Sequence, residues 1–370
     1  MKVVKLKDIC TKGSSSLKQK DVQGKTGKYP VFGASGLIGY IDSYHQEKEY
    51  IGIVKDGSGI GRVMFLPPKS SVIGTLQYIL PKPGYDINYI GYCLKSLDLA
   101  SHKQGAAIPH IYFRDYGEKL VNVEEALDEQ RKIVERLNAA FERIDRMQIN
   151  AETALEEAKG ALAQIIRNSF IPAKDWEEKS IGDLSKDIRY GTSKPSCENG
   201  KYLYLRMNNI TSDGHLTLKD TKTISLEGAE YEKAVVRKGD ILFNRTNSLE
   251  HVGKTCVFDQ EEEMIIAGYL IRVRLKEEII PEFLSYFLNC DTTKTTLRKL
   301  AIGAVHQANI SASSLKKVRI KFPENKAEQE RIVTQIKKIE DKIKALKCNL
   351  DTITEKCNAL KQALLKETFE

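Results

Sequence analysis

The chain has 370 residues, 41% of them hydrophobic, which exceeds the needs of one ordinary core and suffices for two domains with extensions. A formal net charge of +8 favours a polyanionic partner without establishing one. Seven cysteines without a C-x-x-C pair indicate reduced thiols of a cytoplasmic protein, which excludes a disulfide framework and a zinc site. We recognise no signal peptide and no apolar run long enough for a bilayer, so we expect no membrane association.

Residues 1–124 are expected to form a first globular domain built mainly from short strands. Apolar runs at 29–33, 50–54 and 62–65 are rich in β-branched and aromatic residues, and glycine-rich turns separate them. The pattern over 89–94 is typical of one face of a helix. Residues 125–170 then predict a first long helix, over about 127–168.

Residues 171–325 read as a diverged copy of the first domain. Ile60-Gly61-Arg62 corresponds to Val252-Gly253-Lys254, and the helical pattern of the first domain recurs at 283–288. The two copies agree in framework and differ in their loops. Two domains with one scaffold and different ligands would show this pattern.

Residues 326–370 predict a second long helix, over about 327–368. It opens with Glu328-Gln329, which repeats Glu129-Gln130 of the first helix 199 residues later. Apolar residues then recur at steps of three and four, as in a heptad seam: Ile332, Ile336, Ile339, Ile343, Leu346, Leu350, Ile353, Cys357, Leu360 and Leu364. Alanines at 151, 154, 158 and 161 replace the residues at 350, 353, 357 and 360 in the first helix, and we expect them to face the apolar seam.

The sequence therefore predicts an α+β fold, in which two pseudo-twofold-related α/β domains are joined by two long helices that form an antiparallel coiled coil within the chain. Pairing of each helix with another chain is the alternative. A helix of about 42 residues at roughly 1.5 Å per residue is about 63 Å long, close to two turns of duplex DNA. A pseudo-twofold molecule of this kind suits a two-part target such as DNA.

The sequence contains no recognisable catalytic or metal-binding constellation. It has no Walker A lysine motif and no methyltransferase motif of the Asn-Pro-Pro-aromatic or Asp-Pro-Pro-aromatic type. The glycine-rich stretch 57–61 is not followed by a long helix, so we interpret it as a turn between two strands. Six scattered histidines lack metal-ligand spacing. We expect a non-catalytic chain that binds neither metal nor cofactor.

Polar and basic residues near the predicted strand ends are the candidates for DNA contact. Arginine can bond guanine bidentately, asparagine can do the same with adenine, and serine or threonine reaches a base or a phosphate. The most prominent stretch is 244–248, after the predicted strand 240–243, although a solvated turn is the alternative. The candidates are Lys55, Ser58, Arg62, Lys103, Gln104, Arg206, Asn208, Asn244, Arg245, Thr246, Asn247, Lys254, Gln307 and Asn309.

Three features carry a resemblance to a known family: Tyr29-Pro30-Val31-Phe32-Gly33-Ala34-Ser35-Gly36, Lys238-Gly239-Asp240-Ile241-Leu242-Phe243-Asn244-Arg245, and the duplicated Glu-Gln-x-x-Ile-Val helix starts. With them the chain resembles, over nearly its whole length, the specificity (S, HsdS) subunits of type I restriction-modification systems. One departure lies before Glu129, where the family usually has prolines and this chain has Ala126-Leu127-Asp128, which could loosen the junction between domain and helix.

The resemblance implies two target-recognition domains that each read one half of a split site in double-stranded DNA. It also implies helices that space the domains and dock two methyltransferase (M) subunits, with restriction (R) subunits added to the complex. S-adenosylmethionine, ATP and Mg²⁺ are then expected on those partners. The competing interpretations are a self-sufficient DNA methyltransferase, which lacks its motifs here, and a coiled-coil interaction protein without a DNA role, which leaves the paired domains unexplained.

Overall fold

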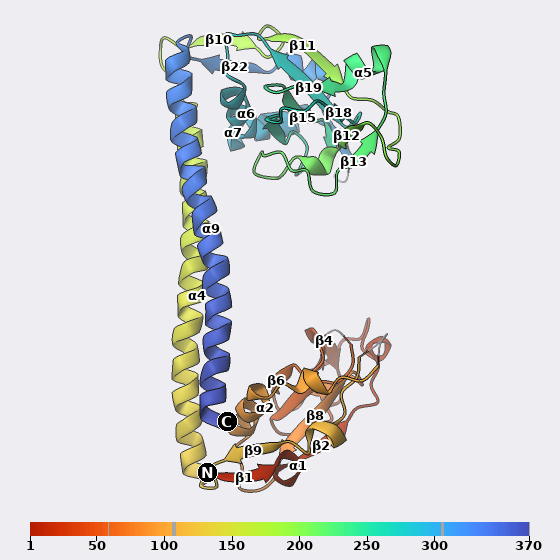
Figure 1. Ribbon diagram of the computed structural model, residues 1–370, viewed down its shortest axis with the longest axis vertical. Helices are drawn as coiled ribbons and strands as arrows, with labels where there is room; N and C mark the ends of the chain where they lie inside the picture. Colours follow the sequence, from red (N-terminus) through yellow and green to blue (C-terminus); the bar gives the residue numbers. More distant parts are fainter. Residues whose placement is uncertain (58, 106–108, 305–306, 370) are drawn as a thin grey trace. The chain divides into compact units, whose positions relative to one another are not determined.

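The computed structural model describes residues 1–57, 59–105, 109–304 and 307–369. They form two compact units, unit 1 with residues 1–152 and 349–370 and unit 2 with residues 153–348. The division runs through two long helices, α4 (Leu127–Ser169) and α9 (Lys326–Phe369), so each unit holds one globular domain and part of both helices (Figure 1). We call the globular parts domain 1 (1–124) and domain 2 (171–325).

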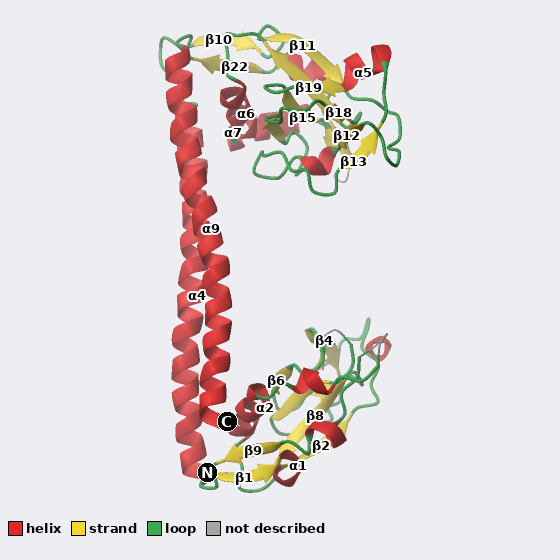
Figure 2. Cartoon of the chain, viewed as in Figure 1, coloured by secondary structure: helices red, strands yellow, loops and turns green. Residues whose placement is uncertain are grey.

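Domain 1 is built mainly from short strands (Figure 2). The strands are β1 (Lys2–Lys5), β2 (Cys10–Ser14), β3 (Tyr29–Gly33), β4 (Gly36–Ile41), β5 (Tyr50–Val54), β6 (Val63–Leu66), β7 (Ser71–Val72), β8 (Leu76–Pro81) and β9 (Leu120–Val123). The helices are α1 (Leu6–Ile9), α2 (Ile87–Ser96) and α3 (Phe113–Tyr116), with 3-10 turns at Gln19–Asp21 and Leu99–His102. Strands β3 and β5 confirm the predicted runs at 29–33 and 50–54, and β6 begins one residue later than predicted.

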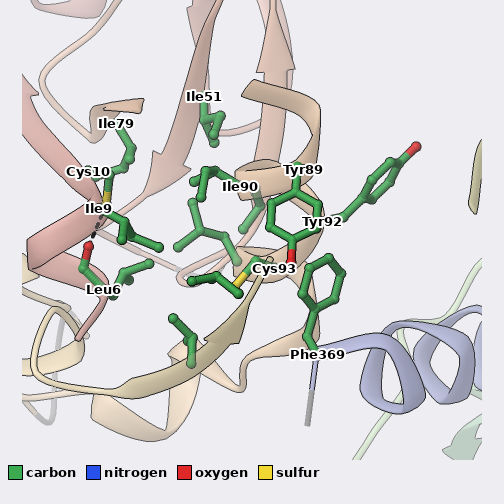
Figure 3. Close-up of a cluster of buried hydrophobic side chains, with 14 of the residues drawn as sticks. Leu6, Ile9, Cys10, Ile51, Ile79, Tyr89, Ile90, Tyr92, Cys93 and Phe369 are labelled. Atoms are coloured by element: carbon green, nitrogen blue, oxygen red, sulfur yellow. Dashed lines mark hydrogen bonds between the residues drawn. The ribbon is translucent and has the colours of Figure 1, made fainter. Parts of the chain in front are cut away.

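The main core of domain 1 also takes in the long helices of unit 1. Strands in the order β2-β8-β5-β6 form a four-stranded sheet, and its buried side chains meet α2, whose N-cap Asp86 accepts backbone hydrogen bonds from the first turn. Leu137 of α4 belongs to the same cluster. Phe369 of α9 belongs to it as well (Figure 3). The Phe369 ring lies edge-on to Tyr89, with ring centroids 5.1 Å apart. Residues near the end of α9 therefore complete the core of domain 1.

Domain 2 has the same kinds of element and more of them. Its strands are β10 (Glu177–Ser180), β11 (Ser185–Tyr190), β12 (Tyr202–Leu205), β13 (Lys222–Ile224), β14 (Val235–Val236), β15 (Ile241–Asn244), β16 (Thr246–Asn247), β17 (Thr255–Val257), β18 (Met264–Ile266), β19 (Leu270–Leu275), β20 (Ile302–Ala304), β21 (Gln307–Asn309) and β22 (Arg319–Phe322). Its helices are α5 (Gly228–Ala234), α6 (Pro281–Asn289), α7 (Asp291–Leu300) and α8 (Ala312–Lys316), with a 3-10 turn at Met207–Asn209.

The strand order confirms that domain 2 repeats domain 1. The sheet β11-β19-β15-β17 corresponds to β2-β8-β5-β6, and the pair β10-β22 corresponds to β1-β9. Each domain also has a further sheet with matching strand directions. In domain 2, β12 pairs antiparallel with β13 and parallel with β18, and in domain 1, β3 pairs antiparallel with β4 and parallel with β7. The turn before β6 and the turn before β17 each place a glycine at positive φ, Gly61 at 81° and Gly253 at 85°. Gly57 and residues 59–61 thus lie in a turn between strands, as predicted, and Ser58 lies outside the described residues.

Helices α4 and α9 pair antiparallel within each unit, so the intramolecular coiled coil is confirmed. In unit 1 the Cys357 thiol of α9 faces the carbonyl oxygen of Ile144 at 3.8 Å, and Lys361 pairs with Asp145. In unit 2 the opposite ends meet, because Leu162, Ile166 and Phe170 pack on the core that holds Ile332 and Ile336. The helix ends lie within one residue of the predicted ones.

The predicted composition of the seam was partly wrong. Ala154 and Ala161 are exposed, while Leu155 is buried, so the buried face of α4 is not the alanine stripe. On α9, Leu346 and Leu360 are 39% and 49% exposed and lie at the edge of the seam or outside it. A straight helix drifts relative to a strict seven-residue repeat, so an unbroken step pattern in the sequence does not keep every member on the buried face.

The repeated Glu-Gln motif ties each domain to its helix. The Gln130 amide donates to the carbonyl oxygens of Gly84 (3.2 Å) and Glu124 (2.8 Å), and its oxygen accepts from the Asp86 N–H at 2.8 Å. Gln329 repeats the pattern with the carbonyls of Glu278 (3.0 Å) and Pro323 (2.8 Å) and the Ile280 N–H (2.9 Å). Both glutamines are fully buried. The missing prolines therefore do not loosen the junction, because these hydrogen bonds close it in both copies.

A second contact between domain and helix differs in character between the units. In unit 1 the Tyr92 hydroxyl donates to the Asn138 side chain, a neutral pair. In unit 2 the Tyr286 hydroxyl donates to the Glu340 carboxylate at 2.5 Å, and His215 lies 3.9 Å from the other carboxylate oxygen. Burial raises the pKa of Glu340, against the opposing effects of the Tyr286 hydrogen bond and of His215. Of these two contacts, only the one in unit 2 involves an ionisable side chain of a long helix, namely Glu340 of α9.

Candidate nucleic-acid interface

In each domain a group of candidate residues begins directly after a central strand of the four-stranded sheet, which is β5 in domain 1 and β15 in domain 2. Lys55 follows β5, and its carbonyl oxygen accepts from the Ile111 N–H at 2.9 Å, while its own N–H donates to Thr75. Arg245 follows β15 and makes the same two bonds, from the Ile310 N–H at 2.9 Å and to the Tyr269 carbonyl. Lys55 and Arg245 therefore occupy equivalent positions in the two domains.

Arg245 is held on three sides by protein groups. Its guanidinium lies over the Tyr190 ring, 4.6 Å from the centroid. Nη1 donates to the Gly268 carbonyl at 3.3 Å, and Nη2 donates to the Asn309 side-chain oxygen at 2.9 Å. The side chain is half-buried. The orientation of the Arg245 guanidinium is thus fixed. Two of the four N–H groups on its terminal nitrogens are not used in these bonds.

Arg245 directly precedes β16, which forms a three-stranded sheet with β21 and β20. Thr246 pairs with Asn309 and Asn247 pairs with Ala308, which brings four candidates into one small sheet. The Thr246 side chain is nearly buried, Asn247 is half-buried with its oxygen bonded to the Ser248 N–H, and Gln307 is exposed. Gln307 and Asn309 alternate with the buried Ala308 and share one side of this sheet, where Arg245 bonds to Asn309. Asn247 pairs with Ala308 and lies on the other side.

The other candidates of domain 2 are Asn244, Lys254, Arg206 and Asn208. Asn244 is 0% exposed, and its amide donates to the Met207 carbonyl at 3.4 Å, so its side chain does not reach the surface. The Lys254 ammonium donates to the Ile210 carbonyl at 2.6 Å, and burial lowers its pKa. Both side chains hold segment 206–210, in which Arg206 is half-buried against the Asp220 carbonyl and Asn208 is exposed.

In domain 1 the equivalent position holds a different set of groups. Asp56 follows Lys55 and accepts from the His110 Nδ1 at 2.7 Å, while the Lys55 ammonium lies 3.6 Å from its other oxygen. His110 also exchanges backbone hydrogen bonds with Gln104, both at 2.8 Å. The Gln104 amide donates to Asp115 at 3.1 Å. Lys55 and Gln104 thus lie close together, because both of their segments bond to the segment that carries His110.

The remaining candidates of domain 1 are Lys103, Arg62 and Ser58. Lys103 is exposed and lies next to Gln104 in the chain. Arg62 donates to the Ala34 carbonyl at 2.8 Å, which matches the role of Lys254 in domain 2. Ser58 lies outside the described residues.

Sequence reasoning missed four residues that shape these surfaces: Tyr190, Asp56, His110 and Tyr112. A signal was available for one of them, because the 199-residue offset of the helix starts also places His110 opposite Asn309. The hydrogen bonds confirm that match, since each of the two precedes the isoleucine bonded to the basic residue. No sequence signal identified the aromatic supports, because they come from distant segments.

Within the described part of the chain, no group of three or more histidine, cysteine, aspartate or glutamate side chains is arranged to hold a metal ion. Among the same residues, no helix is both long and apolar enough to cross a bilayer.

Comparisons with known proteins give a consistent result. A family model described as the type I restriction modification DNA specificity domain matches residues 1–157 and 173–355. A putative type I restriction enzyme MjaX specificity subunit of Methanocaldococcus jannaschii is 29% identical over 203 residues, which cover 53% of this chain and 46% of that protein. The type I restriction enzyme EcoKI specificity subunit of Escherichia coli K12 is 23% identical over 259 residues, covering 66% and 55%. The chain spans about half the length of these curated relatives.

Solved structures agree on the fold. An HsdS subunit from Thermoanaerobacter tengcongensis superposes with a TM-score of 0.55 at 19% identity, covering 99% of this chain and 95% of that one. A chain from a structure of complex assembly and conformational transition in the type I R-M system gives a TM-score of 0.73 at 18% identity, covering 99% and 96%. At these identities the likeness concerns the fold alone.

Proposed function

Because this chain belongs to the family of type I restriction modification DNA specificity domains, we propose that it is the DNA-recognition subunit of a type I restriction-modification complex. It reads a bipartite site in double-stranded DNA, one half-site with each target-recognition domain. The chain itself is not an enzyme, and it acts in the cytoplasm.

The observation that carries this proposal is that the two domains share one backbone framework and present different side chains at the same position. The position after the central strand holds Arg245 bonded to Asn309 in domain 2, and Lys55 with Asp56 and His110 in domain 1. Identical backbone ladders fix both positions. A duplicated reader of a single sequence would keep its contact residues, whereas a reader of two different half-sites changes them and keeps the frame.

The contact residues of domain 2 are Arg245, Asn247, Gln307 and Asn309, supported by Arg206 and Asn208. Lys55, Gln104, Lys103 and Arg62 serve domain 1. Asn244 and Lys254 position the 206–210 segment from within. The two methyltransferase subunits dock on α4 and α9, and restriction subunits join the complex. S-adenosylmethionine, ATP and Mg²⁺ are bound by those partners and not by this chain.

The test is methylome sequencing of a host that carries this chain with its neighbouring modification genes. The expected result is one methylated bipartite sequence that disappears when this chain is deleted and the modification genes are kept. A methylated sequence that persists without this chain would contradict the proposal and favour a self-sufficient methyltransferase among the partners. A chain that binds its partners while no site depends on it would favour a coiled-coil interaction protein.

A further inference from the structure

The ring of His110 has a defined orientation at the reading position of domain 1. Its Nδ1 lies 2.7 Å from the Asp56 carboxylate, and its ring stacks on Tyr112 at an interplanar angle of 25° and a centroid distance of 6.4 Å. The Arg114 guanidinium lies 4.6 Å from the centroid of the Tyr112 ring. The His110 side chain is 38% exposed. The ring is therefore both positioned by the protein and open to solvent.

The Asp56 carboxylate determines which histidine nitrogen carries the hydrogen. An ionised carboxylate only accepts hydrogen bonds, so Nδ1 must donate. In a neutral imidazole the other nitrogen, Nε2, is then an acceptor. Among the described residues, no hydrogen bond to Nε2 accompanies the one at Nδ1. The Lys55 ammonium, 3.6 Å from the second Asp56 oxygen, gives this carboxylate a cationic neighbour.

An acceptor at this place has a limited set of partners on DNA. In the major groove, adenine presents the N6 amine and cytosine presents the N4 amine as donors, whereas guanine and thymine offer oxygen or nitrogen acceptors. The equivalent residue of domain 2, Asn309, instead shares its side-chain oxygen with Arg245. The two domains thus offer different hydrogen-bonding patterns at one position of the same frame.

We propose that His110 is a specificity-determining residue, which accepts a hydrogen bond at Nε2 from an exocyclic base amine in the half-site read by domain 1. Asp56 acts as the positioning residue that selects this tautomer. The inference rests on the proposed function, because it needs domain 1 to be a DNA reader.

The informative variant is Asp56→Asn. Lys55 attracts the amide oxygen of the new asparagine to the place of the second carboxylate oxygen, so the amide nitrogen faces His110. The amide then donates to Nδ1, and Nε2 carries the hydrogen and becomes a donor. His110→Ala removes the contact, and His110→Asn places the amide of domain 2 at this position. Arg245→Ala is the matched variant in domain 2.

The experiment selects bound sequences from a randomised double-stranded DNA library, with each full-length chain co-expressed with its methyltransferase partner. Asp56→Asn is expected to change one base position of one half-site from adenine or cytosine to guanine or thymine. His110→Ala is expected to reduce discrimination at that same position by roughly five- to tenfold, the effect of one lost hydrogen bond. Arg245→Ala is expected to affect the other half-site only.

For the variants of Asp56 and His110, the half-site read by domain 2 is the control. Its unchanged selection shows that the variant chain is folded. Retention of the original base with both Asp56→Asn and His110→Ala would overturn the assignment of His110. Equal loss of both half-sites with His110→Asn, the least disruptive variant, would also overturn it, because the residue would then be structural. If the wild-type complex selects no bipartite sequence, the proposed function itself fails, and this inference fails with it.

Discussion

Replacing Gln329 by leucine removes the polar side chain that joins domain 2 to α9 while keeping a similar volume. Three backbone groups lose their partners, namely the carbonyls of Glu278 and Pro323 and the N–H of Ile280. The glutamine is 0% exposed, so water does not readily replace it. At about 1–3 kcal/mol for each buried group left unpaired, with partial relaxation, we expect a local destabilisation of about 3–5 kcal/mol.

Hydrogen exchange of the full-length chain measures this effect directly. A local loss of this size corresponds to roughly 10²- to 10⁴-fold faster exchange in peptides that cover 278–282 and 323–329. Gln130→Leu is the matched variant, and it should accelerate exchange at the equivalent junction of unit 1 and leave unit 2 unchanged. Gln335→Leu, on the exposed face of α9, is the surface control. Exchange that differs from wild type no more for Gln329→Leu than for Gln335→Leu would refute the reasoning.

Four further predictions concern recognition, geometry, pH and chemistry. Arg245→Ala and Asn247→Ala should relax one half-site by about 1–3 kcal/mol of base discrimination and spare the other; equal damage to both half-sites in the methylome would assign Arg245 a structural role. Four residues inserted into α4 after 152 and into α9 after 348 add about one turn, roughly 6 Å, and should lengthen the unread gap of the methylated sequence by one or two base pairs; an unchanged gap would argue against a spacer role. Burial raises the pKa of Glu340, so the stability linked to this group is present below about pH 4.5 and is lost as the pH rises through the raised pKa. The Glu340→Gln variant should therefore melt at a higher temperature than wild type at neutral pH. Calorimetry should show this difference in melting temperature shrinking in acid. The purified chain with S-adenosylmethionine, ATP, Mg²⁺ and DNA should leave the DNA unmodified, and methyl transfer by the chain alone would contradict its non-catalytic role.

The elements that sequence reasoning predicted best are those governed by a local sequence pattern. Strands β3 and β5 follow from short runs of β-branched and aromatic residues between glycine-rich turns, and both long helices follow from steps of three and four. These patterns depend only on neighbouring residues. The duplication was visible because its framework residues, such as Gln130 and Gln329, meet the same packing demands twice. What these glutamines bind could not be predicted, since their partners are backbone groups of another segment.

The candidate site was predicted in outline and not in detail. Residue type identified Arg245 and Asn309 as possible DNA contacts, but only the fold shows that they bond to each other over Tyr190. Asn244 has the same chemistry as its neighbours in the sequence, yet it ends a strand that is buried on both faces, and its amide bonds to the Met207 carbonyl in the interior. The offset of the repeat singles out His110 as the counterpart of Asn309, but its pairing with Asp56 could not be predicted, because the two residues lie 54 positions apart in the chain.

The packing of Phe369 against Tyr89 has a consequence for the order in which the molecule can be made. Unit 2 is one continuous stretch, so all of its residues have left the ribosome when position 348 has emerged. Domain 1 is synthesised before unit 2, but its core contains Leu365 and Phe369, which are added after every residue of unit 2. Domain 1 must therefore wait, with apolar surface uncovered, until position 369 has emerged. The nascent protein is thus expected to complete its second half before its first, the reverse of the usual vectorial order.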